Sequence, residues 1–317
     1  METSELARLS AATLSSQFLG NFVGVGLAVA DFVCSSLLLA LQVLWKPLRE
    51  KRQFLVMGVA FSDIMKAITM GIIGSSRVYL VMTGRDEITN QLDCMFWLFL
   101  MHFSAIYGVS AVLALSLERT IAICAPVWYY ASSTNIQIAL FTVSVLSAFF
   151  IACMSFVGVS EYSIQPTCTT VGSTTKLFYA CLMWYQYVTI AAIIIFNLIT
   201  GVILFKRWWV ARASRMNMAT FQIDMKLQAI KSVFAVVVVC LLTTFGATLV
   251  MMTIDRMEDS KKPRYGPFVG CFTLLRGIFD FVVLVVLNRE YRTGLALIYP
   301  KGVPRLRPER NIACSSV

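Results

Sequence analysis

The sequence predicts an all-α membrane protein, a bundle of seven transmembrane helices, and two observations support this prediction. The first is composition: 58% of the 317 residues are hydrophobic, only 14% are charged, and the mean hydropathy is +0.75. A soluble globular domain is far more polar. The second is a series of seven apolar runs, each long enough for the roughly 20 residues that a helix needs to cross a bilayer. The runs lie at 17–45, 54–80, 95–123, 134–157, 177–205, 229–253 and 267–287.

The distribution of lysine and arginine orients these helices. With seven spans, the segments 46–53, 124–133, 206–228 and 288–317 lie on one side, and together with Lys231 they carry sixteen basic residues against seven on the other side. Basic residues accumulate on the cytoplasmic side of a membrane. The N-terminus is therefore predicted outside and the C-terminus in the cytoplasm. This topology accounts for the net charge of +10 without a nucleic-acid partner.

Two of the nine cysteines fall on the predicted extracellular side, where a disulfide persists. Cys94 opens the third span, and Cys168 lies in the loop between the fourth and fifth spans. A bridge between them would tie this loop to the third span, and the alternative is two free thiols. In the tail, Cys314 is expected to be a free cytosolic thiol.

Five charged residues lie in the interior of the predicted spans, away from the span ends: Asp31, Asp63, Lys66, Arg276 and Asp280. A charge near the bilayer centre costs about 2.5–3.5 kcal/mol on insertion scales, so we expect these residues to pair with one another. The second span runs outward and the seventh inward. Lys66 and Arg276 therefore share one depth, Asp63 and Asp280 share another, and Asp31 lies near both. The alternative is that Lys66 or Asp31 lines a water-filled cavity.

Several short motifs occur in an order typical of one receptor family. They are "VAFSD" at 59–63, "ERT" at 118–120, and "DFVVL" at 280–284 followed by "NREYRTGL". Cys94 lies 25 residues before Arg119, and Pro126 lies seven residues after it. The chain thus resembles the rhodopsin-like G-protein-coupled receptors, whose Leu-Ala-x-x-Asp, Asp/Glu-Arg-Tyr and Asn-Pro-x-x-Tyr motifs occupy these places. The resemblance implies a short amphipathic helix after the seventh span.

This comparison divides the chain into three parts. Residues 1–16 show no pattern of a removable signal peptide and are expected to form a short extracellular N-terminus. Residues 17–287 form the bundle, and 288–317 form the cytoplasmic amphipathic helix and a basic tail. The chain also departs from the family: Phe281 and Leu284 replace the proline and tyrosine of the seventh span, and Ser35 replaces an asparagine of the first. With these departures, it most resembles the nematode serpentine chemoreceptor branches.

The resemblance implies a coupling switch at the cytoplasmic end of the third span. In receptors of this type, the arginine rests against its neighbouring carboxylate and is released when the sixth span swings outward, so that it faces a heterotrimeric G protein. Arg119 is accordingly the predicted coupling residue and Glu118 its restraint, whereas Thr120 replaces a tyrosine at a tolerant position. Many relatives also hold a sodium ion beside the span-two aspartate, and we hypothesise that Arg276, with help from Lys66, stands in for that ion.

The resemblance places the ligand in the outer half of the bundle. Met101 stands where amine receptors carry an aspartate, and Leu274 stands near the retinal-binding lysine of opsins, so neither an amine nor retinal is expected. The predicted ligand-binding residues are Met101, His102, Ala105, Tyr185, Gln186 and Thr273. This mostly apolar set suits a small, weakly polar ligand. Two interpretations of His102 stay open: a hydrogen-bonded packing residue and a ligand contact.

The predicted function is a multi-pass plasma-membrane chemoreceptor, with the sensory cilium as a candidate site, which couples a small-molecule ligand to a G protein and uses no cofactor or metal. An ion channel or secondary transporter that uses the five intramembrane charges is the alternative, although the sequence shows no internal repeat. An enzyme is not expected, because the chain lacks His-Glu-x-x-His and Gly-x-Ser-x-Gly motifs.

Overall fold

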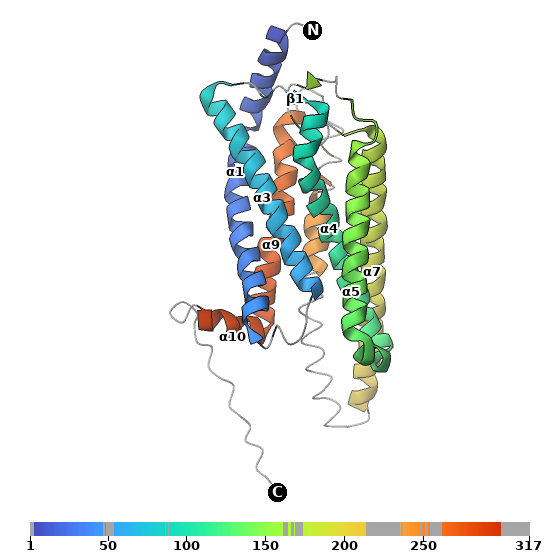
Figure 1. Cartoon of the computed structure of the whole chain (residues 1–317). Helices are drawn as coiled ribbons and strands as arrows, with labels where there is room; N and C mark the ends of the chain where they lie inside the picture. The colour runs from blue at the N-terminus through green and yellow to red at the C-terminus, as the bar shows by residue number, and fades with distance from the viewer. Residues whose placement is uncertain are drawn as a thin grey trace.

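The chain forms a bundle of long helices that lie side by side, as the computed structural model in Figure 1 shows. The structure describes residues 3–46, 48, 54–85, 87, 89–160, 164–165, 168, 174–213, 235, 237–247, 249–250, 253 and 262–298. Within these described residues, six helices are long and apolar enough to cross a membrane. They are α1 (Thr3–Leu44), α3 (Phe54–Thr83), α4 (Gln91–Cys124), α5 (Pro126–Cys153), α7 (Lys176–Ala213) and α9 (Lys262–Leu287).

A shorter apolar helix, Val237–Ala247, lies in the predicted sixth span. The rest of that predicted span, 229–253, falls largely outside the described residues. The described part of the chain thus agrees with a seven-helix bundle. Helices suit a bilayer because each one satisfies its own backbone hydrogen bonds where no water is available.

Helix α4 lies at the centre of the bundle. In its most apolar stretch 67% of the residues are buried, against 17% in α7 and 22% in α5, which expose large apolar side chains such as Trp184 and Phe150. It packs on α3, α5 and α7, and the core includes the ring of Tyr107, which stacks on Phe103 at 5.9 Å between centroids. Among the six described membrane-length helices, α4 is therefore the most deeply embedded in the bundle.

Three helices extend beyond the predicted spans, because polar residues can be helical without being surrounded by lipid. Helix α1 begins at Thr3, so most of the predicted N-terminal segment 1–16 continues the first span as helix. Helix α5 begins at Pro126, inside the predicted loop 124–133, where proline suits a first helical turn. The backbone of Ser132 (φ −123°, ψ 15°) interrupts it before the span proper. Helix α9 begins at Lys262, ahead of Pro267.

The two ends of the bundle carry different features (Figure 1). At the end where the N-terminus lies, β1 (Thr89–Asn90) pairs antiparallel with β2 (Ile164–Gln165), in the register Thr89↔Gln165 and Asn90↔Ile164. The 3-10 turn η1 (Met154–Phe156) follows α5 near this end. At the opposite end, the predicted short helix after the seventh span is present as α10 (Arg289–Ile298) and lies across the bundle. We call these the disulfide end and the α10 end.

Helix α10 is attached to the first span by a buried hydrogen bond. The side-chain amide of Gln42 in α1 donates from Nε2 to the hydroxyl of Tyr291 at 2.9 Å. Burial raises the pKa of Tyr291 to about 12, although the bond from Gln42 opposes this rise. The hydroxyl is therefore still protonated at pH 10, and its bond to Gln42 attaches α10 to α1.

Candidate functional site

The α10 end of α4 carries the predicted coupling pair, and the two neighbours occupy different environments. Glu118 is buried, whereas the side chain of Arg119 is 28% exposed. Arg119 Nε lies 3.2 Å from Glu118 Oε2 as an ion pair, without the alignment of a hydrogen bond. The other carboxylate oxygen, Oε1, accepts hydrogen bonds from the hydroxyl of Tyr129 and from Gln137 Nε2, the latter at 3.0 Å. Glu118 is thus held by α5 as well as by Arg119.

Sequence reasoning missed both α5 donors. Tyr129 lies in the segment expected to be a loop, and helix formation from Pro126 places it beside Gln137, whose Nε2 is 3.3 Å from the tyrosine hydroxyl. These two donors have a chemical consequence. If Arg119 moved away, the buried carboxylate would still accept two hydrogen bonds, which lowers the penalty for leaving a buried charge without its ion-pair partner.

Thr120, predicted to be a tolerant position, contacts α7. Its hydroxyl Oγ1 lies 3.0 Å from Thr200 Oγ1 and 3.2 Å from the carbonyl oxygen of Phe196, both in α7. Nearby, Asn197 Nδ2 donates to Ser116 Oγ at 3.0 Å. We call these contacts, together with the Ser110–Tyr185 bond described below, the α4–α7 seam. These contacts connect α7, the predicted fifth span, to α4, the predicted third span, at several points along their length.

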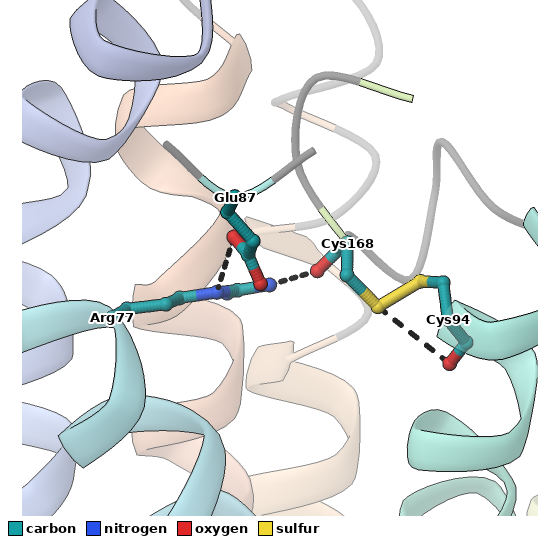
Figure 2. Close-up of a disulfide and its surroundings, with 4 residues drawn as sticks. All are labelled: Arg77, Glu87, Cys94 and Cys168. Atoms are coloured by element: carbon teal, nitrogen blue, oxygen red, sulfur yellow. Dashed lines mark hydrogen bonds and ion pairs between the residues drawn. A yellow bond between two sulfur atoms is a disulfide. The ribbon is translucent and has the colours of Figure 1, made fainter. Parts of the chain in front are cut away.

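At the disulfide end, the structure joins the two predicted cysteines. The sulfur atoms of Cys94 and Cys168 are 1.95 Å apart, and their Cα atoms are 5.3 Å apart. Figure 2 shows that a second contact holds the same loop residue. The guanidinium of Arg77 in α3 donates to the carbonyl oxygen of Cys168, and its Nε lies 3.4 Å from Glu87 Oε2. Cys168 is therefore attached to α3 as well as to α4.

Glu87 completes this second attachment. Its side chain is largely buried, and burial raises the pKa of its carboxyl, while Arg77 and the backbone N–H of Cys168 oppose that rise. Arg77 and Glu87 lie next to a loop, and no spacing rule links them to Cys168. The signal in the sequence was the position of Arg77 inside the predicted second span, because a basic residue in a span rarely lacks a partner.

The five predicted intramembrane charges are all buried, and four of them form two pairs within single helices. Lys66 Nζ lies 2.8 Å from Asp63 Oδ1 in α3, and Arg276 Nε lies 3.5 Å from Asp280 Oδ2 in α9. The expectation that Asp31 also pairs with a basic residue is wrong. Among the described residues, no lysine or arginine is within ion-pair distance of Asp31, whose Oδ1 instead accepts a hydrogen bond from Ser35 at 3.1 Å.

Two contacts connect these pairs to other helices. Lys66 Nζ donates to the carbonyl oxygen of Thr273 in α9 at 3.3 Å, and Arg276 Nη2 donates to the carbonyl oxygen of Gly108 in α4 at 3.0 Å. A Cβ atom at Gly108 would lie 2.8 Å from Arg276 Nη1 and 2.9 Å from Ser62 Oγ, so a larger residue there would displace these side chains. Arg276 therefore connects α9, the predicted seventh span, to α4, the predicted third span.

Within the described part of the chain, no group of three or more His, Cys, Asp or Glu side chains is arranged to hold a metal ion. The aspartates of α1, α3 and α9 therefore do not form a common metal cage there. Instead, Asp31 packs against α9 at Gly277, where a Cβ atom would overlap its carboxylate. The sequence held no signal for this close approach beyond the glycine itself.

The six predicted ligand-binding residues do not form one bonded cluster. Among the described residues, no hydrogen bond or ring contact joins any one of them to another. Met101, together with Ile73, packs against the cluster of Cys94, Leu98 and Cys168. The hydroxyl of Thr273 donates to the carbonyl oxygen of Gly270 in the same helix. The hydroxyl of Tyr185 lies 2.5 Å from Ser110 Oγ, as part of the seam. Ala105 and Gln186 are half-buried, and His102 is buried.

Two comparisons with known proteins bear on the identity of the chain. No curated protein matches the chain. A protein-family model, described as the serpentine type 7TM GPCR chemoreceptor Srsx, matches residues 28–299. This match spans all the helices described above from within α1 to the end of α10, and it confirms the resemblance to nematode-type chemoreceptors. It also agrees with the expectation that the chain is not an enzyme. The chain therefore belongs to the Srsx family of serpentine seven-transmembrane chemoreceptors.

Proposed function

We propose that the chain binds a small extracellular ligand and transmits this event to a cytoplasmic heterotrimeric G protein through Arg119. One observation carries the proposal: Arg119 is part-exposed beside a buried carboxylate that α5 holds independently. In this proposal the pair has two states. In one, Arg119 pairs with Glu118, and in the other it faces a partner protein while Tyr129 and Gln137 still satisfy the acid.

The proposed orientation follows from charge and redox chemistry. Basic residues are concentrated in segments that adjoin the α10 end, which favours the cytoplasm for that end. The disulfide favours the oxidising, extracellular side for the other end. This orientation supports a multi-pass location in the plasma membrane, with the sensory cilium as the proposed compartment for a chemoreceptor.

Helix α4 is the proposed connection between ligand and G protein. It carries Met101, His102 and Ala105 toward one end and Glu118 and Arg119 at the other. The α4–α7 seam and the bond from Arg276 to Gly108 attach this helix to α7 and α9. A ligand that binds one arrangement of these helices better than another shifts the population of the coupling state, because only differential affinity can move such an equilibrium.

We propose that Arg276, together with Lys66, occupies the electrostatic role of a bound sodium ion. Arg276 is buried beside Asp280, and its guanidinium reaches the third helix at Gly108. Lys66 neutralises Asp63 in the same way. Two tethered cations thus accompany two of the three buried aspartates, and a mobile ion would meet an already neutralised pair.

One experiment tests the proposed function against a channel or transporter, the alternative suggested by the buried charges. Cells that express the chain with a promiscuous G protein are exposed to a panel of volatile and small water-soluble odorants. Nucleotide exchange on the G protein and ion current are measured in the same cells. Ligand-dependent exchange that disappears in Arg119→Ala supports the receptor. A ligand-dependent current that persists without the G protein would support a channel or transporter instead.

A further inference from the structure

His102 is the only histidine of the chain, and its imidazole is buried without a polar partner. The residue is 4% exposed in α4, and neither Nδ1 nor Nε2 has a hydrogen-bond partner among the residues that the structure describes. Its ring faces the ring of Phe178 in α7, with 5.2 Å between centroids. An unsatisfied buried polar group costs free energy, and native proteins rarely keep one without a reason.

Several hydroxyl groups of the bundle have hydrogen-bond partners, whereas both imidazole nitrogens of His102 have none. The hydroxyl of Ser104 donates to the carbonyl oxygen of Met101 at 3.0 Å, and Ser110 Oγ lies 2.5 Å from the hydroxyl of Tyr185. Thr273 donates to Gly270. A histidine that served only packing would be expected to hydrogen bond in the same way. Its unused donor and acceptor instead indicate a group that binds something from outside the chain.

The surroundings of His102 define what it can bind. One turn before it, Leu98 packs with Met101 and the disulfide of Cys94 and Cys168, and Phe178 covers the ring. No described acidic or basic side chain pairs with the imidazole. A ligand with a full charge would therefore be buried beside apolar groups without a counter-ion, which is costly.

We propose that His102 recognises an uncharged small molecule that carries a hydroxyl or carbonyl group. This inference rests on the proposed function and specifies its ligand. A neutral imidazole offers one N–H donor and one acceptor nitrogen, and a hydroxyl can pair with either. A carbonyl oxygen can accept from the N–H. A hydrocarbon of the same shape offers neither contact, and an ammonium or carboxylate adds an uncompensated charge.

The first test measures binding at the residue itself. The chain is produced with ¹⁵N-labelled histidine and a purification tag that contains no histidine, so that every imidazole signal in nanodiscs comes from His102. The probes are two matched series, on the hexane and the toluene skeletons: alcohol, aldehyde, hydrocarbon, ammonium and carboxylate. We expect an alcohol or aldehyde to shift the ¹⁵N resonances, and the other three members of its series to leave them unchanged. If no alcohol or aldehyde shifts the resonances, the inference is wrong.

The second test separates recognition from packing. His102→Phe keeps a ring of similar shape and removes both nitrogens, so we expect the melting temperature of the ligand-free receptor to hold or rise, because an unsatisfied buried group is lost. The potency of the active alcohol should fall about tenfold, toward that of the hydrocarbon. His102→Gln, which keeps a donor and an acceptor, should restore part of the potency. A drop in melting temperature with unchanged alcohol potency would identify a packing residue.

The two tests also distinguish this inference from the proposed function. A ¹⁵N shift without any activation of a G protein would leave ligand recognition intact and overturn the coupling role. Activation by an alcohol that is equal in the wild type and in His102→Phe would support the receptor and overturn the role of His102. The ¹⁵N measurement on the wild type decides the question even if a variant fails to fold.

Discussion

Tyr129 donates its hydroxyl to the carboxylate of Glu118, so that the acid beside Arg119 is anchored to α5. Gln137 adds a second donor at 3.0 Å from the same oxygen. In the proposed coupling pair, Glu118 is therefore the more firmly held member, and Arg119, with its 28% exposed side chain, is the one we expect to move. The predictions for this end of the bundle depend on that division.

Substitutions in the coupling pair should change activity in opposite directions. Arg119→Ala removes the residue that would face the G protein, so agonist binding should persist while agonist-driven nucleotide exchange is lost. Glu118→Gln keeps an acceptor for Tyr129 but weakens the attraction for Arg119, so basal exchange should rise several-fold. Both quantities are measured with purified receptor in nanodiscs and G protein. Normal agonist-driven exchange in Arg119→Ala would remove the coupling role.

Tyr129→Phe should have the opposite effect to Glu118→Gln. Without the tyrosine hydroxyl, the buried carboxylate depends more on Arg119, and release of the arginine becomes harder. A hydrogen bond to a charged group is worth about 1.5–3 kcal/mol, so the agonist concentration for half-maximal exchange should rise about tenfold or more. Tyr130→Phe is the matched control, because Tyr130 is 89% exposed. Equal dose–response curves for the two variants would contradict the anchoring role of Tyr129.

The loop residue Cys168 should depend on both of its attachments. Cys94→Ala and Cys168→Ala should each abolish surface expression or ligand response, because they release the loop from α4. Arg77→Met keeps the apolar stem and removes the donor to Cys168, so it should lower surface expression and melting temperature even with the disulfide intact. Arg85→Met, at an exposed position, serves as the control. A stable, fully expressed Arg77→Met receptor would show that the second attachment is dispensable.

The buried cations should be essential for stability and should make the receptor insensitive to sodium. Arg276→Leu leaves Asp280 and the carbonyl of Gly108 without their partner, a change that typically costs about 3–5 kcal/mol. Asp280→Asn leaves Arg276 its bond to Gly108 and should destabilise less. Thermal unfolding in detergent compares the two variants.

Sodium dependence is tested separately, with agonist affinity measured at constant ionic strength while sodium replaces a large organic cation. We expect no change in affinity. A clear fall with sodium would show that the region still admits the ion, and that Arg276 does not take its place.

Features that depend on local chain properties could be predicted from the residues alone. The positions of the six described membrane-length helices follow from runs of apolar residues, because the thickness of a bilayer sets the length that must be apolar. Cys94 and Cys168 could be paired because the predicted topology left no other cysteine on their side of the membrane. The short helix α10 follows the seventh span as the motif "NREYRTGL" suggested.

What only the tertiary structure decided is which side chains meet. Asp31 accepts a hydrogen bond from Ser35 and packs on Gly277, although Lys66 and Arg276 were predicted at a similar depth. Depth in the membrane does not specify which faces of two helices come together. Tyr129 reaches Glu118 because the segment after Pro126 is helical, a choice that hydropathy does not decide for polar residues near the membrane surface. The sequence by itself thus determined the spans, their order and the family. The contacts that make up the candidate sites arose from the packing of helix faces, which is a property of the whole bundle.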